Sequence, residues 1–167
     1  GVDEFFSAAR TLKAEFGGEV AFDVVGFYED AYKEQVDQLV ADGIVRFHGF
    51  QTDVHPFYEA ADCVVLPSYH EGMSNVLLEG AATGRALITS DIPGCREAVE
   101  DGVSGYLCPA QDAEGLTQAM RDFAQQSFDR QVQMGQSGRA LVERKFDKQL
   151  VVAKTLDGLG LPAAVRS

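Results

Sequence analysis

The stretch that decides the fold spans residues 67–85 and reads PSYHEGMSNVLLEGAATGR. It follows a short apolar run at residues 63–66, and its second half has the apolar spacing of a helix. In open α/β sheets, ligands bind at the carboxyl ends of the strands, so the loop that leaves Leu66 lies where a ligand is expected. Gly72 lets the backbone come close to a ligand, and Ser74 is a good N-cap, which leaves the first N–H groups of the helix facing outward. This segment therefore predicts a strand, an anion-binding loop and a helix, in that order.

Similar apolar runs alternate with helical patterns along most of the chain. Strands are predicted at residues 20–25, 44–47, 63–66, 86–89 and 106–108, and helices at residues 2–16, 28–41, 54–60 and 75–83. A short helix is expected at residues 95–100, followed by a helical tail whose last helix spans residues 146–156. Apolar strands that alternate with helices of this length form a parallel sheet covered on both faces. The predicted fold class is α/β, a Rossmann-like doubly wound parallel sheet with a helical C-terminal tail.

Composition and charge narrow the classes of partner. The 167 residues fit one domain, and 46% of them are hydrophobic and 24% charged, as in an ordinary globular protein. A net charge of −12 repels phosphate backbones, so nucleic acid is not an expected partner. No run approaches the roughly 20 apolar residues of a membrane-spanning helix. Cys63, Cys95 and Cys108 lack metal-ligand spacing; they predict a reducing compartment, and we assign them no chemistry.

Two carboxylates bracket the predicted anion site. Glu71 lies in the loop before the helix, and Glu79 lies about one turn into it, five residues beyond Ser74. A carboxylate beside a phosphate site repels the phosphate unless it faces hydroxyl groups, so both residues suit hydrogen bonds from sugars. Two glutamates with seven residues between them are also common on solvated helix faces. The combination with a preceding strand, a loop glycine and an N-cap favours the sugar interpretation.

At this point a family resemblance becomes clear. The run from Glu71 to Glu79 resembles the motif of two glutamates separated by seven residues in the family 4 glycosyltransferases, which have the two-domain GT-B fold. The similarity covers roughly residues 1–143 and includes the segments FHGF at 47–50, ADCVVLPS at 61–68, DIPGCRE at 91–97 and DGVSG at 101–105. The segment EGMSNVLLE is most similar to the bacterial branch that builds capsule, O-antigen and lipid-linked oligosaccharides from UDP-sugars. The chain then corresponds to the C-terminal, nucleotide-sugar-binding half of such an enzyme.

The resemblance implies a role for each site residue. Glu71 is the catalytic-site carboxylate and touches a hydroxyl of the donor sugar, while Glu79 accepts hydrogen bonds from the ribose. The donor sugar and the diphosphate lie against the backbone of the residues between them, Gly72, Met73, Ser74, Asn75, Val76 and Leu77, with the N–H groups of Val76 and Leu77 on the diphosphate. The base lies against the loop of Arg46 and Phe47 and is held mainly by main-chain groups.

The reaction implied by the resemblance is transfer of a hexosyl group with retention of anomeric configuration. Stabilisation of the leaving diphosphate by positive charges and N–H dipoles then supplies most of the catalysis. Neither a metal nor another cofactor is expected, because no cluster of His, Asp and Cys is present to bind a metal. The family carries an Arg after its first strand and a Lys before its first helix, both on the diphosphate, and neither is present upstream of Gly1. Arg85 and Arg96 are the nearest candidates for a diphosphate-binding cation, although Arg85 suits a helix C-terminus.

The domain organisation follows from the same comparison. A sheet of this kind begins with a strand that feeds the first helix, so we expect residues 1–167 to form a single donor-binding domain without that strand and without the N-terminal acceptor domain. The isolated chain is expected to be inactive or nearly so. The intact enzyme is expected in the cytoplasm, at the cytoplasmic face of the inner membrane, with a glycan or lipid-linked acceptor bound through the other domain.

Three rival functions belong to other classes. A nicotinamide-dependent oxidoreductase shares the alternation of strands and helices, but the sequence lacks Gly-x-Gly-x-x-Gly after any strand. A sugar-nucleotide 2-epimerase of the same architecture and a non-catalytic nucleotide-binding module remain open. His70 is interpreted as a loop residue rather than a general base, and Ser68 and Ser74 lack a paired base, so a serine hydrolase is not supported.

Overall fold

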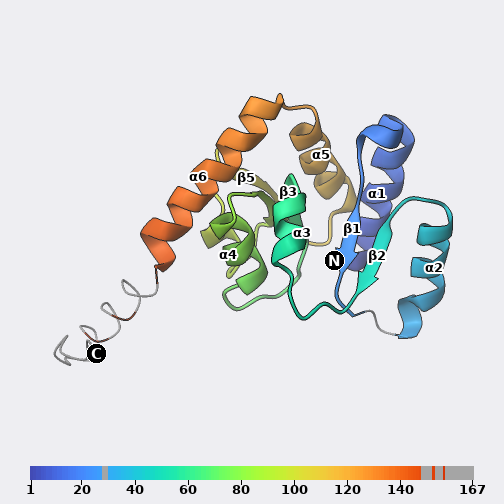
Figure 1. Cartoon of the computed structure of the whole chain (residues 1–167), viewed down its shortest axis with the longest axis horizontal. Helices are drawn as coiled ribbons and strands as arrows, with labels where there is room; N and C mark the ends of the chain where they lie inside the picture. Colours follow the sequence, from blue (N-terminus) through green and yellow to red (C-terminus); the bar gives the residue numbers. More distant parts are fainter. Residues whose placement is uncertain (28–29, 148–151, 153–155, 157–167) are drawn as a thin grey trace.

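The structure is a computed structural model that describes residues 1–27, 30–147, 152 and 156. Its described strands run parallel within each of two sheets (Figure 1). The first sheet pairs β1 (Asp23–Val25) with β2 (Arg46–Gly49). The second sheet has the order β3 (Cys63–Leu66), β4 (Ala86–Ser90) and β5 (Gly105–Cys108).

Helices connect these strands. They are α1 (Val2–Phe16), α2 (Lys33–Ala41), α3 (His55–Ala60), α4 (Asn75–Ala82), α5 (Ala113–Ala124) and α6 (Phe128–Phe146). In Figure 1, α5 lies beside α1, and α6 runs past α4. The α/β fold class and the helical C-terminal part are therefore as predicted.

The side chains of β4 show that helices cover both faces of the second sheet. All five residues of β4 are buried, because a central parallel strand contacts a helical layer on each side. Ala86 and Ile88 pack into one core cluster with Leu12 of α1 and Leu116 of α5. Leu87 points the other way, into a second cluster that contains residues of α4 and α6, namely Leu77, Ala81 and Val142. This alternation is what a doubly wound sheet requires.

Some predicted boundaries differ from the observed ones. The first strand begins only at Asp23, and the short helix expected at residues 95–100 is a single 3-10 turn, Arg96–Ala98. The helix expected at 28–41 is a 3-10 turn, Asp30–Tyr32, followed by α2, and residues 28 and 29 lie outside the described part. Most of the helix expected at 146–156 also lies outside the described residues, since Phe146 is the last residue of α6.

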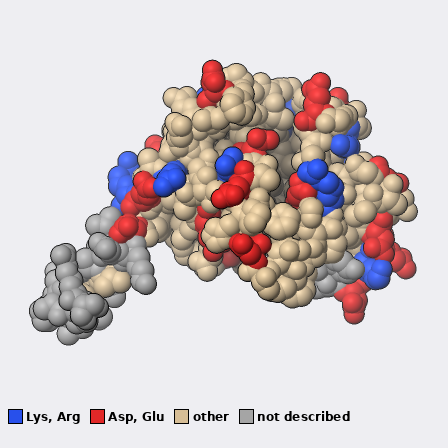
Figure 2. Space-filling model, viewed as in Figure 1, with Lys and Arg blue, Asp and Glu red and all other residues tan. Residues whose placement is uncertain are grey.

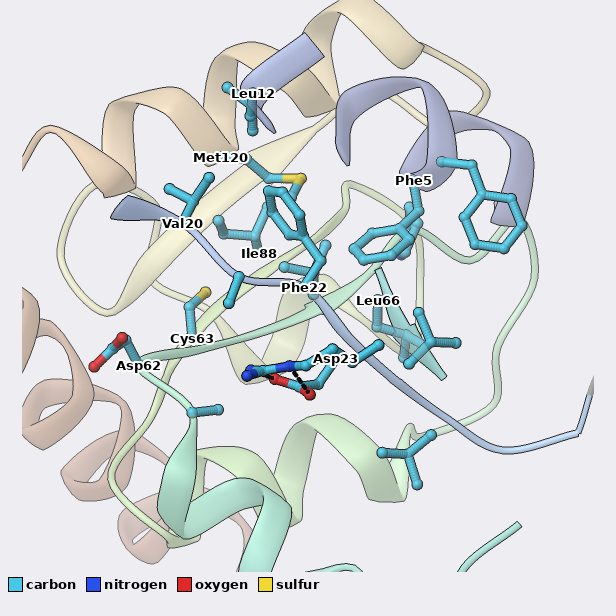
Figure 3. Close-up of a pocket in the computed structure, with 18 of the residues that line it drawn as sticks. Phe5, Leu12, Val20, Phe22, Asp23, Asp62, Cys63, Leu66, Ile88 and Met120 are labelled. Carbon is cyan, nitrogen blue, oxygen red and sulfur yellow. Dashed lines mark hydrogen bonds and ion pairs between the residues drawn. The ribbon is translucent and has the colours of Figure 1, made fainter. Parts of the chain in front are cut away.

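The larger difference is that the expected continuous sheet is split between β1 and β3. A cavity of about 800 Å³ lies at the split. Its lining includes Phe22, all of β1, and Cys63, Val65 and Leu66 of β3. Figure 3 shows its mostly apolar wall, with Leu12 of α1 and Met120 of α5 above the strands. No strand among the described residues lies between β1 and β3.

The surface is rich in acidic groups. Figure 2 shows Asp and Glu side chains spread over one face, with Lys and Arg scattered among them and no extended basic region on that face. The distribution agrees with the net charge of −12 and does not suit a nucleic-acid backbone. None of the helices in the described ranges is long and apolar enough to cross a membrane.

Candidate functional site

The loop after β3 leads into α4 through a side-chain N-cap. Ser74 has an extended backbone conformation, and its buried Oγ accepts a hydrogen bond from the N–H of Leu77 at 3.4 Å. Asn75 and Val76, the first two helical residues, are exposed, and backbone N–H groups in the first turn have no partner within the helix itself. Of the two predicted diphosphate donors, the N–H of Leu77 is thus engaged by the cap, while Val76 is 41% exposed. The end of the helix can bind an anion through its backbone and its dipole.

The loop after β4 holds the β3 loop in place. The N–H of Ser74 donates to the carbonyl oxygen of Gly94 at 3.2 Å, and the N–H of Gly94 donates to Oε2 of Glu97 at 2.8 Å. Gly94 has a φ of +88°, which side-chain-bearing residues rarely adopt. The carboxyl ends of two neighbouring parallel strands are joined by these contacts, so the predicted ligand loop is built from two segments.

Glu71 lies at the start of this site. Its Oε1 accepts a hydrogen bond from Oγ of Ser68 at 2.8 Å, and its side chain is exposed. Ser68 lies two residues after the end of β3, so its hydrogen bond links the loop carboxylate of Glu71 to the strand end. An exposed carboxylate held by one neighbouring hydroxyl retains free lone pairs for a hydroxyl-bearing ligand.

Glu79 lies further along α4 and contacts α3. The hydroxyl of Tyr58 donates to Oε2 of Glu79 at 3.2 Å. Tyr58 is 9% exposed, and burial, with the charge of Glu79 beside it, raises the pKa of Tyr58 to about 12. The phenol is therefore a hydrogen-bond donor at neutral pH. Sequence reasoning missed Tyr58, because an aromatic residue in a short amphipathic helix has the pattern of an ordinary core residue.

The predicted base-binding residues lie elsewhere on the first sheet. Arg46 is the first residue of β2, and its Nε and Nη2 donate to the two carboxylate oxygens of Asp23 at 2.8 and 2.5 Å. His48 Nε2 lies 2.6 Å from Oδ1 of Asp23. Burial alone would raise the pKa of Asp23, but the hydrogen bonds from Arg46 and His48 outweigh it and lower that pKa. Phe47 packs against the core cluster of α1 and α2, so both side chains have partners within the protein. The predicted contact of the base with main-chain groups of this loop stays a prediction.

Two aromatic rings do lie at that carboxyl end. Phe27 follows β1 and Phe50 follows β2, and their rings stack with centroids 4.6 Å apart and planes 10° apart. The pair is unusually open to solvent, since Phe27 is 81% and Phe50 58% exposed. The N–H of Gly26 donates to the carbonyl oxygen of Gly49 at 2.9 Å, which holds the two strand ends together. The segment FHGF was noted in the sequence, but nothing in its spacing indicated an exposed aromatic pair.

The remaining candidates take other positions. Arg96 donates from Nη2 to the carbonyl oxygen of Asp91 at 2.7 Å and forms an ion pair with its carboxylate, within the β4 loop. Arg85 directly precedes β4, at the amino end of the sheet and so opposite the crevice. His70 is exposed in the β3 loop. Burial raises the pKa of all three cysteine thiols, to about 11 for Cys108, so none is an activated nucleophile. The described residues contain no group of three or more His, Cys, Asp or Glu placed to hold a metal ion.

Comparison with protein families and curated proteins gives a consistent match. Residues 1–126 match the family described as glycosyl transferases group 1. The chain is 30% identical over 118 residues to the N,N'-diacetylbacillosaminyl-diphospho-undecaprenol alpha-1,3-N-acetylgalactosaminyltransferase of Campylobacter jejuni, covering 71% of this chain and 30% of that protein. It is 29% identical over 126 residues to the lipopolysaccharide core biosynthesis glycosyltransferase LpsE of Rhizobium meliloti, covering 75% of this chain and 37% of that protein. The chain thus spans about a third of the length of these relatives.

Solved structures match the fold. HepE from Anabaena in complex with UDP superimposes with a TM-score of 0.79 and 22% sequence identity, covering 92% of this chain and 44% of HepE. The C-terminal domain of the glycosyl transferase group 1 family protein LpcC from Francisella tularensis gives a TM-score of 0.77 and 24% identity, covering 89% of this chain and 80% of that one. The architecture is therefore that of the C-terminal domain of a GT-B glycosyltransferase.

Proposed function

This chain belongs to the glycosyl transferases group 1 family, and from that membership we propose that it is the donor-binding domain of a retaining enzyme of family 4. The intact enzyme transfers a sugar from a UDP-sugar to a glycan or lipid-linked acceptor in the synthesis of bacterial surface polysaccharide. The curated relatives support this class of acceptor, because one is named for a diphospho-undecaprenol substrate and another for lipopolysaccharide core synthesis. A UDP complex of a protein with the same fold supports the nucleotide.

The observation that carries the proposal is the conjunction at α4. A capped helix N-terminus lies between the loop carboxylate Glu71 and the helix carboxylate Glu79. Because the N–H of Leu77 is engaged by Ser74, we revise the predicted pair of diphosphate donors, Val76 and Leu77. In the proposed complex, the N–H groups of Asn75 and Val76 bind the diphosphate, and the helix dipole stabilises its charge. Glu71 accepts a hydrogen bond from the donor sugar, and Glu79 accepts from the ribose hydroxyls. Gly72 and Met73 line the sugar through their backbone.

The proposed catalysis is mainly electrostatic. As the bond between the sugar and the diphosphate breaks, negative charge grows on the diphosphate, and N–H donors fixed in place before the reaction stabilise it. The cap at Ser74 and the contact with Gly94 keep these donors oriented in the absence of ligand. Glu71 binds the sugar rather than attacking it, and the acceptor approaches from the same face as the leaving group, which retains the configuration. The scheme requires no metal.

We also propose an aromatic contact for the base, beside the predicted main-chain contact. The assignment to Arg46 and Phe47 stays a prediction, but the guanidinium of Arg46 is engaged by Asp23 and Phe47 packs against the core. Ligands of parallel sheets bind at carboxyl strand ends, where Phe50 exposes an aromatic ring. We therefore place the base against Phe50, since flat aromatic faces stack favourably on nucleobases.

The unpaired edges of β1 and β3 extend this proposal to the arrangement of the intact enzyme. Within the described residues, the edge of β1 that does not pair with β2 and the edge of β3 that does not pair with β4 border the same cavity of about 800 Å³. Unpaired backbone groups beside an apolar cavity are costly, and a parallel strand that led into α1 would satisfy both edges with a right-handed crossover. We propose that such a strand joins the two sheets in the intact enzyme, and that a separate N-terminal domain binds the acceptor. The intact enzyme then works in the cytoplasm, at the membrane that carries its acceptor.

Titration of the chain with UDP, GDP, ADP and NADH by calorimetry tests the assignment. We expect UDP to bind with the highest affinity. Binding of NADH without UDP would replace this proposal with an oxidoreductase. Binding of none of the four nucleotides would contradict the proposal and favour a non-catalytic interaction module.

A further inference from the structure

The contact between α3 and α4 joins a buried phenol to an exposed carboxylate. Tyr58 is 9% exposed, and its hydroxyl is 3.2 Å from Oε2 of Glu79, on the neighbouring helix. The ring is thus fixed by the packing around it, while the carboxylate it contacts reaches solvent. A glutamate side chain has three rotatable bonds and is otherwise free to adopt several rotamers at a surface position.

We propose that Tyr58 is a positioning residue that orients the Glu79 carboxylate for the ribose hydroxyls of the nucleotide. This inference rests on the proposed function, in which Glu79 is the ribose ligand. The hydroxyl of Tyr58 occupies one lone pair of Oε2, which leaves Oε1 and the second lone pair of Oε2 for the two ribose hydroxyls. Fixing the side chain before the ligand arrives lowers the entropy lost on binding.

The hydrogen bond can persist across the working pH range. Burial is the main cause of the raised pKa of Tyr58, which at about 12 keeps the phenol protonated at neutral pH. The phenol is therefore a donor whenever the carboxylate of Glu79 is ionised. At the end of the same helix, Oγ1 of Thr83 donates to the backbone carbonyl of Glu79 at 2.8 Å, so the backbone and the carboxylate of Glu79 have separate hydrogen-bond partners.

The alternative is that Tyr58 is buried for packing alone. The two roles differ in what the hydroxyl does, since packing depends on the ring and positioning depends on the oxygen. Tyr58→Phe removes the oxygen and retains the ring. Tyr106→Phe is the matched control, because the hydroxyl of Tyr106 accepts a hydrogen bond from Gln126 Nε2 at 3.2 Å on the β5 side of the molecule.

The test is the ratio of affinities for UDP and 2′-deoxy-UDP, measured by calorimetry on the native chain, Tyr58→Phe, Tyr106→Phe and Glu79→Ala. We expect the native chain and Tyr106→Phe to prefer UDP, and Glu79→Ala to lose the preference. Tyr58→Phe should reduce the preference at least about 3-fold, which corresponds to roughly half the net free energy of a hydrogen bond to a charged group. Thermal unfolding of each variant checks that the fold is retained.

Two results would overturn the inference, and they are distinguishable. In the first, Tyr58→Phe lowers the affinities for UDP and 2′-deoxy-UDP equally, or leaves both unchanged, while Glu79→Ala removes the preference. In that case the hydroxyl does not orient the carboxylate, and the proposed function stands. If the native chain binds UDP no better than 2′-deoxy-UDP, or does not bind UDP, the ribose role of Glu79 fails, and the inference about Tyr58 fails with it.

Discussion

Gly94 lies so close to the carbonyl oxygen of Gly72 that a Cβ atom on Gly94 would be 1.5 Å from that oxygen. Neither the clash nor the φ of +88° can be relieved by a side-chain rotation, because both involve backbone atoms. The loop after β4 therefore constrains the position of the loop after β3 at the point where the sugar is proposed to bind. Glycine at this position is required by the close approach of two backbones.

Gly94→Ala is expected to move the loop of Glu71 and Gly72 and to lower UDP affinity at least about 10-fold, because donors displaced by about 1 Å lose most of their contribution. Gly102→Ala is the control. Gly102 also has a positive φ, of +70°, but no atom lies within 4 Å of a Cβ placed there, so that variant suffers backbone strain alone, at about 1 kcal/mol of unfolding free energy. Equal UDP affinities in the two variants would show that the contact with Gly72 has no part in binding.

Ser74→Ala removes the N-cap of α4 and is expected to cost about 1 kcal/mol of unfolding free energy. It should also weaken UDP binding, since the first turn of α4 loses its orientation. Ser127 caps α6 in the same way, accepting from the N–H of Arg130 at 3.3 Å. Ser127→Ala should therefore destabilise the fold by a similar amount, measured by urea unfolding, and leave UDP affinity unchanged. A parallel loss of UDP affinity in both variants would mean that the cap acts only through stability.

Asp23 contributes stability that depends on pH. Its pKa is lowered in the folded chain, so its contribution is present in full above the pKa of the unfolded state, near 3.8, and is lost as the pH falls through the folded value. Because the side chain is partly exposed, we expect Asp23→Asn to cost no more than about 1 kcal/mol at pH 7. The difference from the native chain should be smaller at pH 3, below the pKa of the unfolded state, than at pH 7. Urea unfolding at both pH values, with Asp62→Asn as an exposed control, measures it; a difference that grows in acid would contradict the direction of the shift.

Phe50→Ala should weaken UDP binding by about 1 to 2 kcal/mol, or roughly 5- to 30-fold, through loss of stacking with the base. Arg46→Ala should leave the affinity within about 2-fold, because the guanidinium is paired with Asp23. Calorimetric titration of both variants tests the contact with Phe50. The opposite pattern, with binding lost only in Arg46→Ala, would contradict stacking of the base on Phe50.

The sequence predicts the fold class well because β3 and β4 are near-continuous apolar runs and α4 carries both a cap and a regular stripe. The N-cap at Ser74 was confirmed for the same reason, since capping depends on local chemistry. The split between β1 and β3 could not be read from local pattern, because strand pairing depends on which edges meet in space. The hydrogen bond of Tyr58 and the stacking of Phe27 on Phe50 could not be predicted either, because both join segments that are distant in the sequence.

The most direct test of the whole account is the UDP affinity of Glu79→Ala, measured beside Glu114→Ala, which removes an exposed glutamate from the first turn of α5. Hydrogen bonds to a charged group contribute about 1.5 to 3 kcal/mol, so we predict a loss of roughly 10-fold or more in Glu79→Ala and no loss in Glu114→Ala. An unchanged affinity in Glu79→Ala, with the fold intact, would contradict the assignment of this crevice as the nucleotide-sugar site.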